Sequence, residues 1–431
     1  MAGARFFLAS MLTAALLATA GCVGHTGTPR SGPSSSPALD VIDDPATLKP
    51  LKLSDEPLWS HHDIPRMKVV EYFAIQDDAA LVFGGDGVQA MDRLAIVDAA
   101  TGRTRWAIGG SAPLGLRGGD GASFWHANHS IAPRIVGKGD DWSVIVEYYK
   151  QAGGDRFGLA ALSGKDGRVR WKTPPIDLAR ADTTELRVVD VDNEIALVER
   201  TSDGTTSTIA IDVSNGRTLW DVPNVFPRGV SDGVVVAEIP KQSDWTNPVD
   251  GIQERTVVAL DAKTGKRLWG LSDRYPRSVV GLVAGSAIVV RIPGRVKGST
   301  RTLVVGTRSG DMLAELKPTA GDRCHSDRTT LIACLTYRTP QRLATYHLRD
   351  HTAGISAHET PDQFVREVWS GRIFMSATWA ASTCKSYDRS GNPIDKKLPG
   401  TPALISDQYA AFYTEQPDLH DPGLVVHRRL G

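Results

Sequence analysis

The chain has 431 residues, and its 49 Lys and Arg side chains balance 49 Asp and Glu side chains, which gives a formal net charge of zero at pH 7. This balance, with no run of five or more basic residues, argues against a nucleic-acid partner. The 42 Gly and ten Trp residues, with few stretches of helical periodicity, exclude a mainly helical protein and favour an all-β one.

Residues 1–21 are predicted to be a lipoprotein signal peptide. Arg5 supplies a basic start, residues 6–20 are apolar, and small residues precede Cys22 in the sequence TAGC. Cys22 would then carry lipid chains that anchor the mature protein. The alternative is an ordinary secretory peptide with an incidental Cys, and the apolar run is shorter than the roughly 18–20 residues of a membrane-spanning helix.

This reading predicts an exported protein, lipid-anchored to the outer side of a bacterial cytoplasmic membrane or to the periplasmic side of an outer membrane. Residues 22–50 are the lipidated Cys and a linker rich in Gly, Ser, Thr and Pro, a composition that buries too little apolar surface to fold. Residues 51–431 are the predicted folded domain.

Four stretches of this domain predict nearly identical β-hairpins. They read IVDAATGRTRW at 96–106, AALSGKDGRVRW at 160–171, IAIDVSNGRTLW at 209–220 and VVALDAKTGKRLW at 257–269. In each, an apolar strand leads to a Gly where the turn requires a positive φ, and a Trp follows that Gly by four residues. Turn glycines recur at Gly310 and Gly391, and residues 343–354 lie where a decayed copy is expected. A spacing in the forties is typical of propeller blades.

The hairpins resemble the PQQ-like β-propeller repeat, of the form ALDxxTGxxxW, which residues 259–269 match almost letter for letter. The resemblance implies that the Trp of the outer strand packs between neighbouring blades. The residues at this position are Trp106, Trp171, Trp220 and Trp269, and Trp59 is expected to do the same in the last blade. The fifth copy has Ala314 instead.

Eight apolar runs predict one inner strand in each repeat. They cover residues 79–83, 144–148, 195–198, 234–239, 287–292, 331–337, 373–377 and 409–413. The eighth repeat has a further strand at 424–430 but no outer strand, whereas residues 57–59 form an outer strand with no preceding hairpin. We therefore expect eight blades of four antiparallel strands, the last one closed by the N-terminal strand, because closure removes free sheet edges. Seven blades is the alternative.

Three cysteines remain after Cys22. Cys324 and Cys334 have a spacing that suits the first two strands of the sixth blade facing each other, and an exported chain permits disulfides. The alternatives are three buried thiols or a bridge from Cys334 to Cys384. The spacing of these cysteines does not suggest a zinc site.

The long connections, at 108–141, 149–157, 240–255, 293–301 and 415–423, are all expected on one face of the ring. Long loops on a rigid scaffold often carry binding functions, although drift in length is the alternative. The candidate binding residues there are Trp125, His126, His129, Asp244 and Trp245. The two histidines fit surface or structural roles better than metal ligation, and Trp245 could equally anchor a partner or fold back onto its blade.

The resemblance raises the possibility of a quinone cofactor. Quinoprotein dehydrogenases of this superfamily use adjacent cysteines, which are missing here, and no GxSxG, HExxH or P-loop pattern occurs. The sequence thus favours a monomeric, membrane-tethered, non-catalytic scaffold that binds an envelope protein or polymer, without metal or cofactor. The alternative is an exported quinoprotein-like or carbohydrate-active enzyme, or a small-ligand binder that uses the central funnel.

Overall fold

The structure is a computed structural model. It describes residues 40–42, 48–86, 93–109, 122–123, 133–137, 139–150, 156–174, 176–177, 185–202, 205–240, 255–294, 300–316, 320–336, 341–360, 363–376, 384–416 and 419–430. The chain divides into two units, Met1–Pro37 and Ala38–Gly431, and every described element belongs to the second. Among the described residues, no helix has the length and apolar character needed to cross a membrane.

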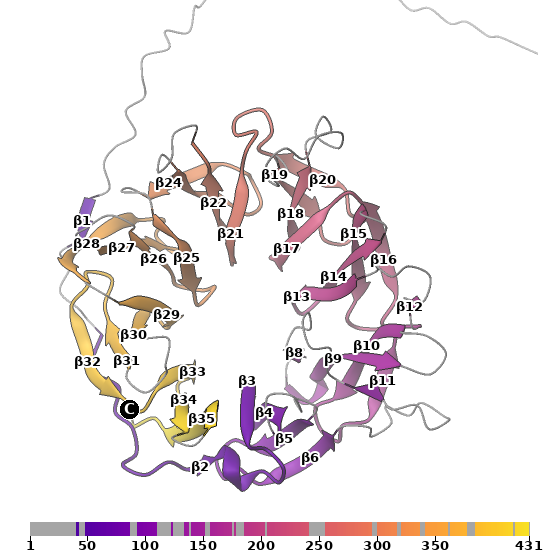
Figure 1. The fold of residues 1–431 in the computed structure, drawn as a ribbon, viewed down its shortest axis with the longest axis vertical. Helices are drawn as coiled ribbons and strands as arrows, with labels where there is room; N and C mark the ends of the chain where they lie inside the picture. The colour runs from indigo at the N-terminus through magenta and orange to yellow at the C-terminus, as the bar shows by residue number, and fades with distance from the viewer. Residues whose placement is uncertain are drawn as a thin grey trace, which may run out of the picture. The chain divides into compact units, whose positions relative to one another are not determined.

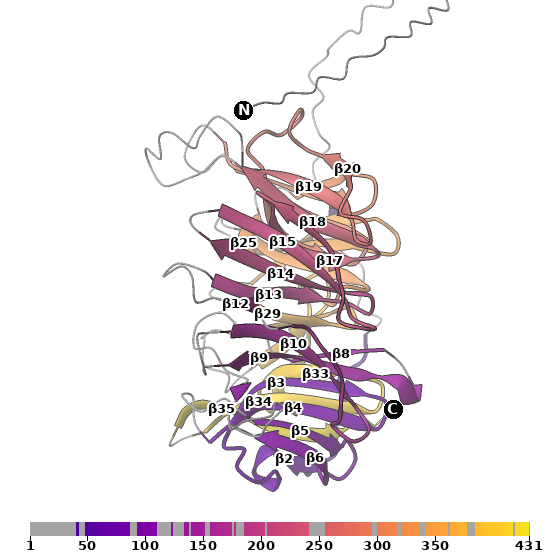
Figure 2. The same ribbon diagram turned by 90° about the vertical axis from the view of Figure 1, so that its right-hand side faces the viewer.

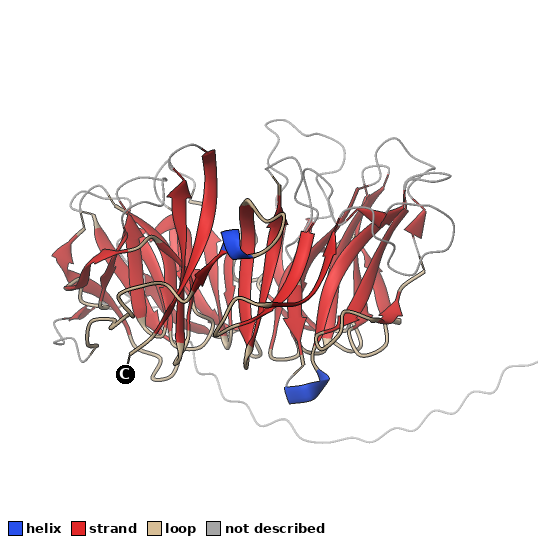
Figure 3. Cartoon of the chain, turned by 90° about the horizontal axis from the view of Figure 1, so that it is seen from below, coloured by secondary structure: helices blue, strands red, loops and turns tan. Residues whose placement is uncertain are grey.

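The second unit is an eight-bladed β-propeller, as predicted: eight antiparallel sheets surround a common centre (Figure 1). Viewed from the side, neighbouring blades follow one another around the ring, for example β13–β15 beside β17–β19 (Figure 2). Apart from the short 3₁₀ turns η1 (His61–Asp63) and η3 (Gly139–Asp141), the described elements are strands (Figure 3).

The first four blades are the following. Blade 1 contains β3 (Val69–Gln76), β4 (Ala79–Gly85), β5 (Arg93–Asp98) and β6 (Thr104–Gly109). Blade 2 contains β7 (Ala122–Ser123), β8 (Arg134–Val136), β9 (Ser143–Lys150), β10 (Arg156–Ser163), β11 (Val169–Lys172) and β12 (Ile176–Asp177). Blade 3 contains β13 (Glu185–Val191), β14 (Ile195–Ser202), β15 (Thr205–Asp212) and β16 (Thr218–Pro223). Blade 4 contains β17 (Phe226–Ser231), β18 (Val234–Pro240), β19 (Arg255–Asp261) and β20 (Arg267–Gly270).

The other four blades follow in chain order. Blade 5 contains β21 (Val279–Ala284), β22 (Ala287–Ile292), β23 (Arg301–Gly306) and β24 (Met312–Leu316). Blade 6 contains β25 (Ala320–Ser326), β26 (Leu331–Thr336), β27 (Arg342–His347), β28 (Ala353–Glu359) and, on its outer edge, β1 (Asp40–Ile42). Blade 7 contains β29 (Phe364–Trp369), β30 (Arg372–Ser376), β31 (Cys384–Tyr387) and β32 (Pro393–Leu398). Blade 8 contains β33 (Thr401–Ile405), β34 (Tyr409–Gln416), β35 (Leu419–Arg428) and β2 (Trp59–Ser60).

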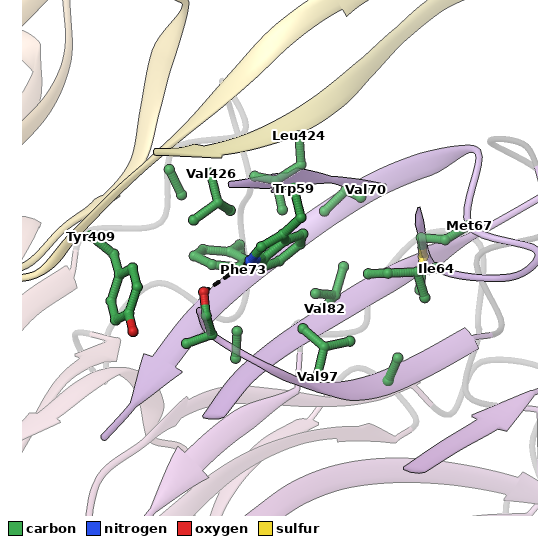
Figure 4. Close-up of a cluster of buried hydrophobic side chains, with 14 residues drawn as sticks. Trp59, Ile64, Met67, Val70, Phe73, Val82, Val97, Tyr409, Leu424 and Val426 are labelled. Atoms are coloured by element: carbon green, nitrogen blue, oxygen red, sulfur yellow. Dashed lines mark hydrogen bonds between the residues drawn. The ribbon is translucent and has the colours of Figure 1, made fainter. Parts of the chain in front are cut away.

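The ring closes through the N-terminal strand, which confirms the prediction for the last blade. β2 pairs antiparallel with β35, with Trp59 opposite Val426. Around this pair, a buried cluster joins blade 8 to blade 1, and Trp59 packs beside Phe73 with its ring centroid 6.1 Å away (Figure 4). The two ends of the chain therefore share one blade, which removes an open seam from the ring.

The eight apolar runs found in the sequence form the second strand of each blade. In β4, for example, all seven residues are buried. A second strand has a strand on each edge and a neighbouring blade on each face, so it tolerates an unbroken apolar run. The first strand of each blade borders the ring centre, as β13, β17 and β21 show in Figure 1.

The predicted hairpin chemistry is present in the third and fourth strands. The turn glycines have positive φ, from +68° at Gly265 to +84° at Gly391. At 261–266 the Asp261 carboxylate accepts hydrogen bonds from the N–H and the hydroxyl of Thr264, which holds the turn in shape. The decayed copy in blade 6 forms the same turn with His351 at φ +59°.

The hydrophobic core is divided into eight clusters, each between two adjacent blades. The cluster between blades 3 and 4, for example, contains Leu197, Trp220 and Val258. A chain of this length thereby avoids a single large core, because each blade buries its faces only against its neighbours.

Candidate functional site

The residues predicted to bind a partner, namely Trp125, His126, His129, Asp244 and Trp245, lie outside the described residues, as does Cys22. The predicted long-loop face depends largely on the same undescribed segments. The remaining predicted residues can be placed.

Five Trp residues make the same contact with the next blade, which we call the Trp latch. Each ring lies on the turn glycine of that blade; a Cβ on Gly265, for example, would lie 2.9 Å from Cδ2 of Trp220. Each indole N–H donates to a backbone oxygen in the same turn, over 2.8–3.0 Å. The pairs are Trp59 with Ala99, Trp106 with Gly164, Trp171 with Val213, Trp220 with Ala262, and Trp269 with Thr307.

The structure joins Cys324 and Cys334 by a disulfide between β25 and β26, where the two residues face each other. Cys384 is a free, buried thiol, and burial raises its pKa to about 12. A thiol with this pKa stays protonated and unreactive at neutral pH.

An open groove of about 780 Å³ lies on the face formed by the short turns, across blades 3 to 6. We call it the charged groove. Its lining comprises the turns 192–194 and 231–234 with Asp261, Lys263, Leu268, Arg308 and Arg328. All of these belong to the connections of first with second strands, or to the hairpins of third with fourth strands, so regular blade geometry brings them together.

Local turn chemistry sets the walls of the groove. The Asp192 carboxylate accepts the N–H groups of Glu194 and Ile195, both at 2.8 Å, and so shapes the turn that starts β14. In the next blade, Asp232 and Gly233 both have positive φ, +53° and +74°, as a two-residue type I′ hairpin turn requires.

Cationic side chains link one blade to another along the groove. Nζ of Lys263 in blade 4 lies 3.4 Å from Oε2 of Glu194 in blade 3. Nη2 of Arg308 in blade 5 donates to the backbone oxygen of Asp232 in blade 4 over 2.7 Å. These pairs are mostly exposed, so each contributes at most about 1 kcal/mol to stability.

Arg328 in blade 6 contacts a residue of a blade that is not its neighbour. Its Nη2 lies 3.2 Å from Oδ2 of Asp190, which joins blade 6 to blade 3 although two blades separate them. Asp190 is 5% exposed, and its carboxylate also accepts the N–H groups of Val191 and Val230, at 3.0 and 3.1 Å. Because it is held from three sides, this carboxylate gives Arg328 a fixed position at the end of the groove.

The pKa of Asp192, an acidic residue in the wall of the groove, is raised. Burial raises the pKa of Asp192, and the charges of Asp190 and Glu194 add to the rise, while hydrogen bonds from two backbone N–H groups oppose it. An incoming cationic group beside Asp192 would relieve this repulsion.

A second group of ionisable residues borders the ring centre, on the inner parts of blades 7, 8 and 1. Tyr413 donates a hydrogen bond to the backbone oxygen of Glu71 over 3.2 Å. Burial raises the pKa of Tyr413, and the charges of Tyr72, Glu367 and Glu71 raise it further. Burial also raises the pKa of Glu71, and it raises that of Glu367 to about 7 against a partial opposing effect of Arg366.

The Glu367→Gln variant tests this environment. Because the folded-state pKa of Glu367 lies above its unfolded value, the wild-type carboxyl favours the folded state most below about pH 4 and loses that contribution as the pH rises through 7. We expect the variant to gain stability relative to wild type by about 1–2 kcal/mol at pH 8 and to gain little at pH 5. Urea unfolding at the two pH values measures the difference. An equal effect at both would contradict the raised pKa.

Within the described ranges, no group of three or more His, Cys, Asp or Glu side chains could hold a metal ion. The charged groove was not found from the sequence. Its turns are short and polar, as turns usually are, and Asp190 and Arg328 lie 138 positions apart. The contact between Asp190 and Arg328 becomes evident only from the three-dimensional arrangement of the blades.

No protein-family model matches the chain, and no curated protein matches it either. Among solved structures, BamB from Moraxella catarrhalis is 13% identical, with 88% of this chain and 100% of BamB covered and a TM-score of 0.46. A quinohemoprotein alcohol dehydrogenase from Pseudomonas putida HK5 is 11% identical, with 88% and 78% covered and a TM-score of 0.46. Sqt1 from Saccharomyces cerevisiae is 9% identical, with 90% and 100% covered and a TM-score of 0.42. At these values the likenesses carry no argument about function.

Proposed function

We propose that the chain is an exported β-propeller of the PQQ-like repeat type, tethered to a bacterial membrane through Cys22, that binds an envelope protein without catalysing a reaction. The charged groove across blades 3 to 6 is the observation that carries the proposal. The membrane tether is inferred from the sequence of residues 1–22 alone.

The lining of the groove favours a polypeptide over a uniformly charged polymer. It presents four acidic side chains, Asp192, Glu194, Asp232 and Asp261, beside the basic Lys263, Arg308 and Arg328. A polymer of one charge would be repelled by about half of these groups, whereas a polypeptide can place a complementary charge beside each. Leu268, 49% exposed, adds an apolar contact that a protein partner can cover.

Photo-crosslinking tests the proposal. A photoreactive amino acid replaces Leu268 in the full chain, expressed in its native host, and the membrane fraction is irradiated. The matched control position is Leu219, which also directly precedes a latch Trp and is 40% exposed but does not line the groove. We expect one defined protein adduct from position 268 and none of that mass from position 219.

Charge reversal provides the specificity control. Lys263→Glu together with Arg308→Glu should remove the adduct. Lys165→Glu should leave it unchanged, because Lys165 occupies the same hairpin position, two residues before the turn Gly, in blade 2. The Cys22→Ser chain should leave the membrane fraction. Equal adducts from both positions, or an adduct that survives the charge reversal, would refute the groove as the binding site.

A further inference from the structure

Among the described residues, the Trp latch occurs at five of the eight blade interfaces. Four of these Trp residues, all except Trp59, follow the positive-φ residue of their own hairpin by four positions. The same count from Gly310, His351 and Gly391 leads to Ala314, Ile355 and Asp395. Blades 5, 6 and 7 therefore have no aromatic ring at this position.

Residues 40–42 and 48–55 of the N-terminal segment contact two of these three positions, Ile355 and Asp395. β1 pairs in parallel with β28, with Val41 opposite Ile355. Further along, the backbone N–H of Leu51 donates to Oδ1 of Asp395 over 2.9 Å. The third position, Ala314, belongs to an interface filled by aliphatic side chains that include Leu316 and Leu348.

Buried contacts hold the segment on blades 7 and 8. Arg372, 5% exposed, donates to the backbone oxygen of Lys49, and its Nη1 lies 3.6 Å from Oδ2 of Asp395. Leu51 and Leu53 pack against the hydrophobic cluster between blades 7 and 8. The segment then bonds to β35, through the N–H of Ser54 and the backbone oxygen of Arg428 at 3.0 Å, before it reaches the Trp59 latch.

We propose that residues 40–42 and 48–55, which we call the N-terminal strap, take the place of the Trp latch on blades 6 and 7 and hold that sector of the ring together. The outer edges of these two blades are thus a docking surface for an extended polypeptide, occupied by the N-terminal segment of the same chain. On blade 6 the strap adds a paired strand, and on blade 7 it adds the hydrogen bond to Asp395 and the packing of Leu51 and Leu53.

Hydrogen exchange in the full chain tests the strap. Val41→Pro removes a strand N–H in β1, and Leu51→Pro removes the N–H that Asp395 accepts while leaving blade 7 itself unchanged. In the double variant we expect amide exchange in β28 and β32 to become about ten-fold faster or more, while exchange in β14 and β15 of blade 3 stays unchanged. A synthetic peptide of residues 38–55, added in excess, should restore part of the protection.

The local pattern separates this role from general destabilisation. Unchanged exchange in β28 and β32, or an equal acceleration in all blades, would overturn the proposal. If the double variant does not fold, the single variants give separate readouts: Val41→Pro should affect β28 and Leu51→Pro should affect β32. Effects of both single variants confined to other blades would also overturn it.

Discussion

Replacement of Glu238 with Ala is expected to lower the free energy of unfolding by about 3–5 kcal/mol, because it breaks a buried charge network. Glu238 is 0% exposed, and its Oε2 lies 2.7 Å from Nη2 of Arg228 and 3.5 Å from Nη1 of Arg255. Its Oε1 accepts the N–H of Val280 in blade 5 over 2.8 Å. The variant would leave two part-buried guanidinium groups and one N–H without this acceptor. Urea unfolding measures the loss.

Glu199 is the matched control, since it occupies the same place in the second strand of blade 3. In the strand register, Glu199 lies four residues after Ile195, which faces Asp212, as Glu238 lies four residues after Val234, which faces Asp261. Within the part of the chain that the structure describes, Glu199 forms an ion pair with Arg187, whose side chain is 40% exposed, over 3.1 Å. We expect Glu199→Ala to cost about 1 kcal/mol or less. Similar losses from both variants would show that burial is not what makes Glu238 important.

The Trp220→Ala variant should lose about 3–5 kcal/mol of stability, the range for removal of a large buried aromatic side chain. Trp220 is 9% exposed, covers Gly265 of the next blade and donates to the backbone oxygen of Ala262 over 2.8 Å. Thermal and urea unfolding measure the change.

The neighbouring residue serves as the control. Leu219→Ala removes an apolar side chain that is 40% exposed, and it should change stability by no more than about 0.5 kcal/mol. A loss of less than 1 kcal/mol for Trp220→Ala would mean that the indole is not needed for packing of blade 3 on blade 4.

Much of the fold could be predicted because the residues that specify the hairpin of each blade lie close together in the sequence. An apolar strand, an Asp at its end, a Gly that permits positive φ and a Trp four residues later specify a hairpin within about a dozen residues. Repetition then implies a ring, and the count of apolar runs implies eight blades. The apolar runs mark the second strand of each blade, because that strand has another strand on each edge and a neighbouring blade on each face.

The binding site could not be predicted in this way. Long loops and aromatic residues directed attention to one face, whereas the charged groove is built from short turns whose sequences look ordinary. One end of the groove depends on the contact of Arg328 with Asp190, 138 positions away, and the strap depends on the contact of Leu51 with Asp395, 344 positions away. Neither pair leaves a pattern in the local sequence.

The amino-acid sequence by itself therefore determined the all-β class, the blade as the repeating unit, the number of blades and the closure by residues 57–60. Backbone preferences and side-chain periodicity act over a few residues, so a single sequence records them directly. The tertiary structure alone decided which distant turns share a groove and which vacant latch positions the N-terminal strap covers. Such contacts depend on how every blade is oriented relative to the next around the ring. No short segment of the sequence determines that arrangement.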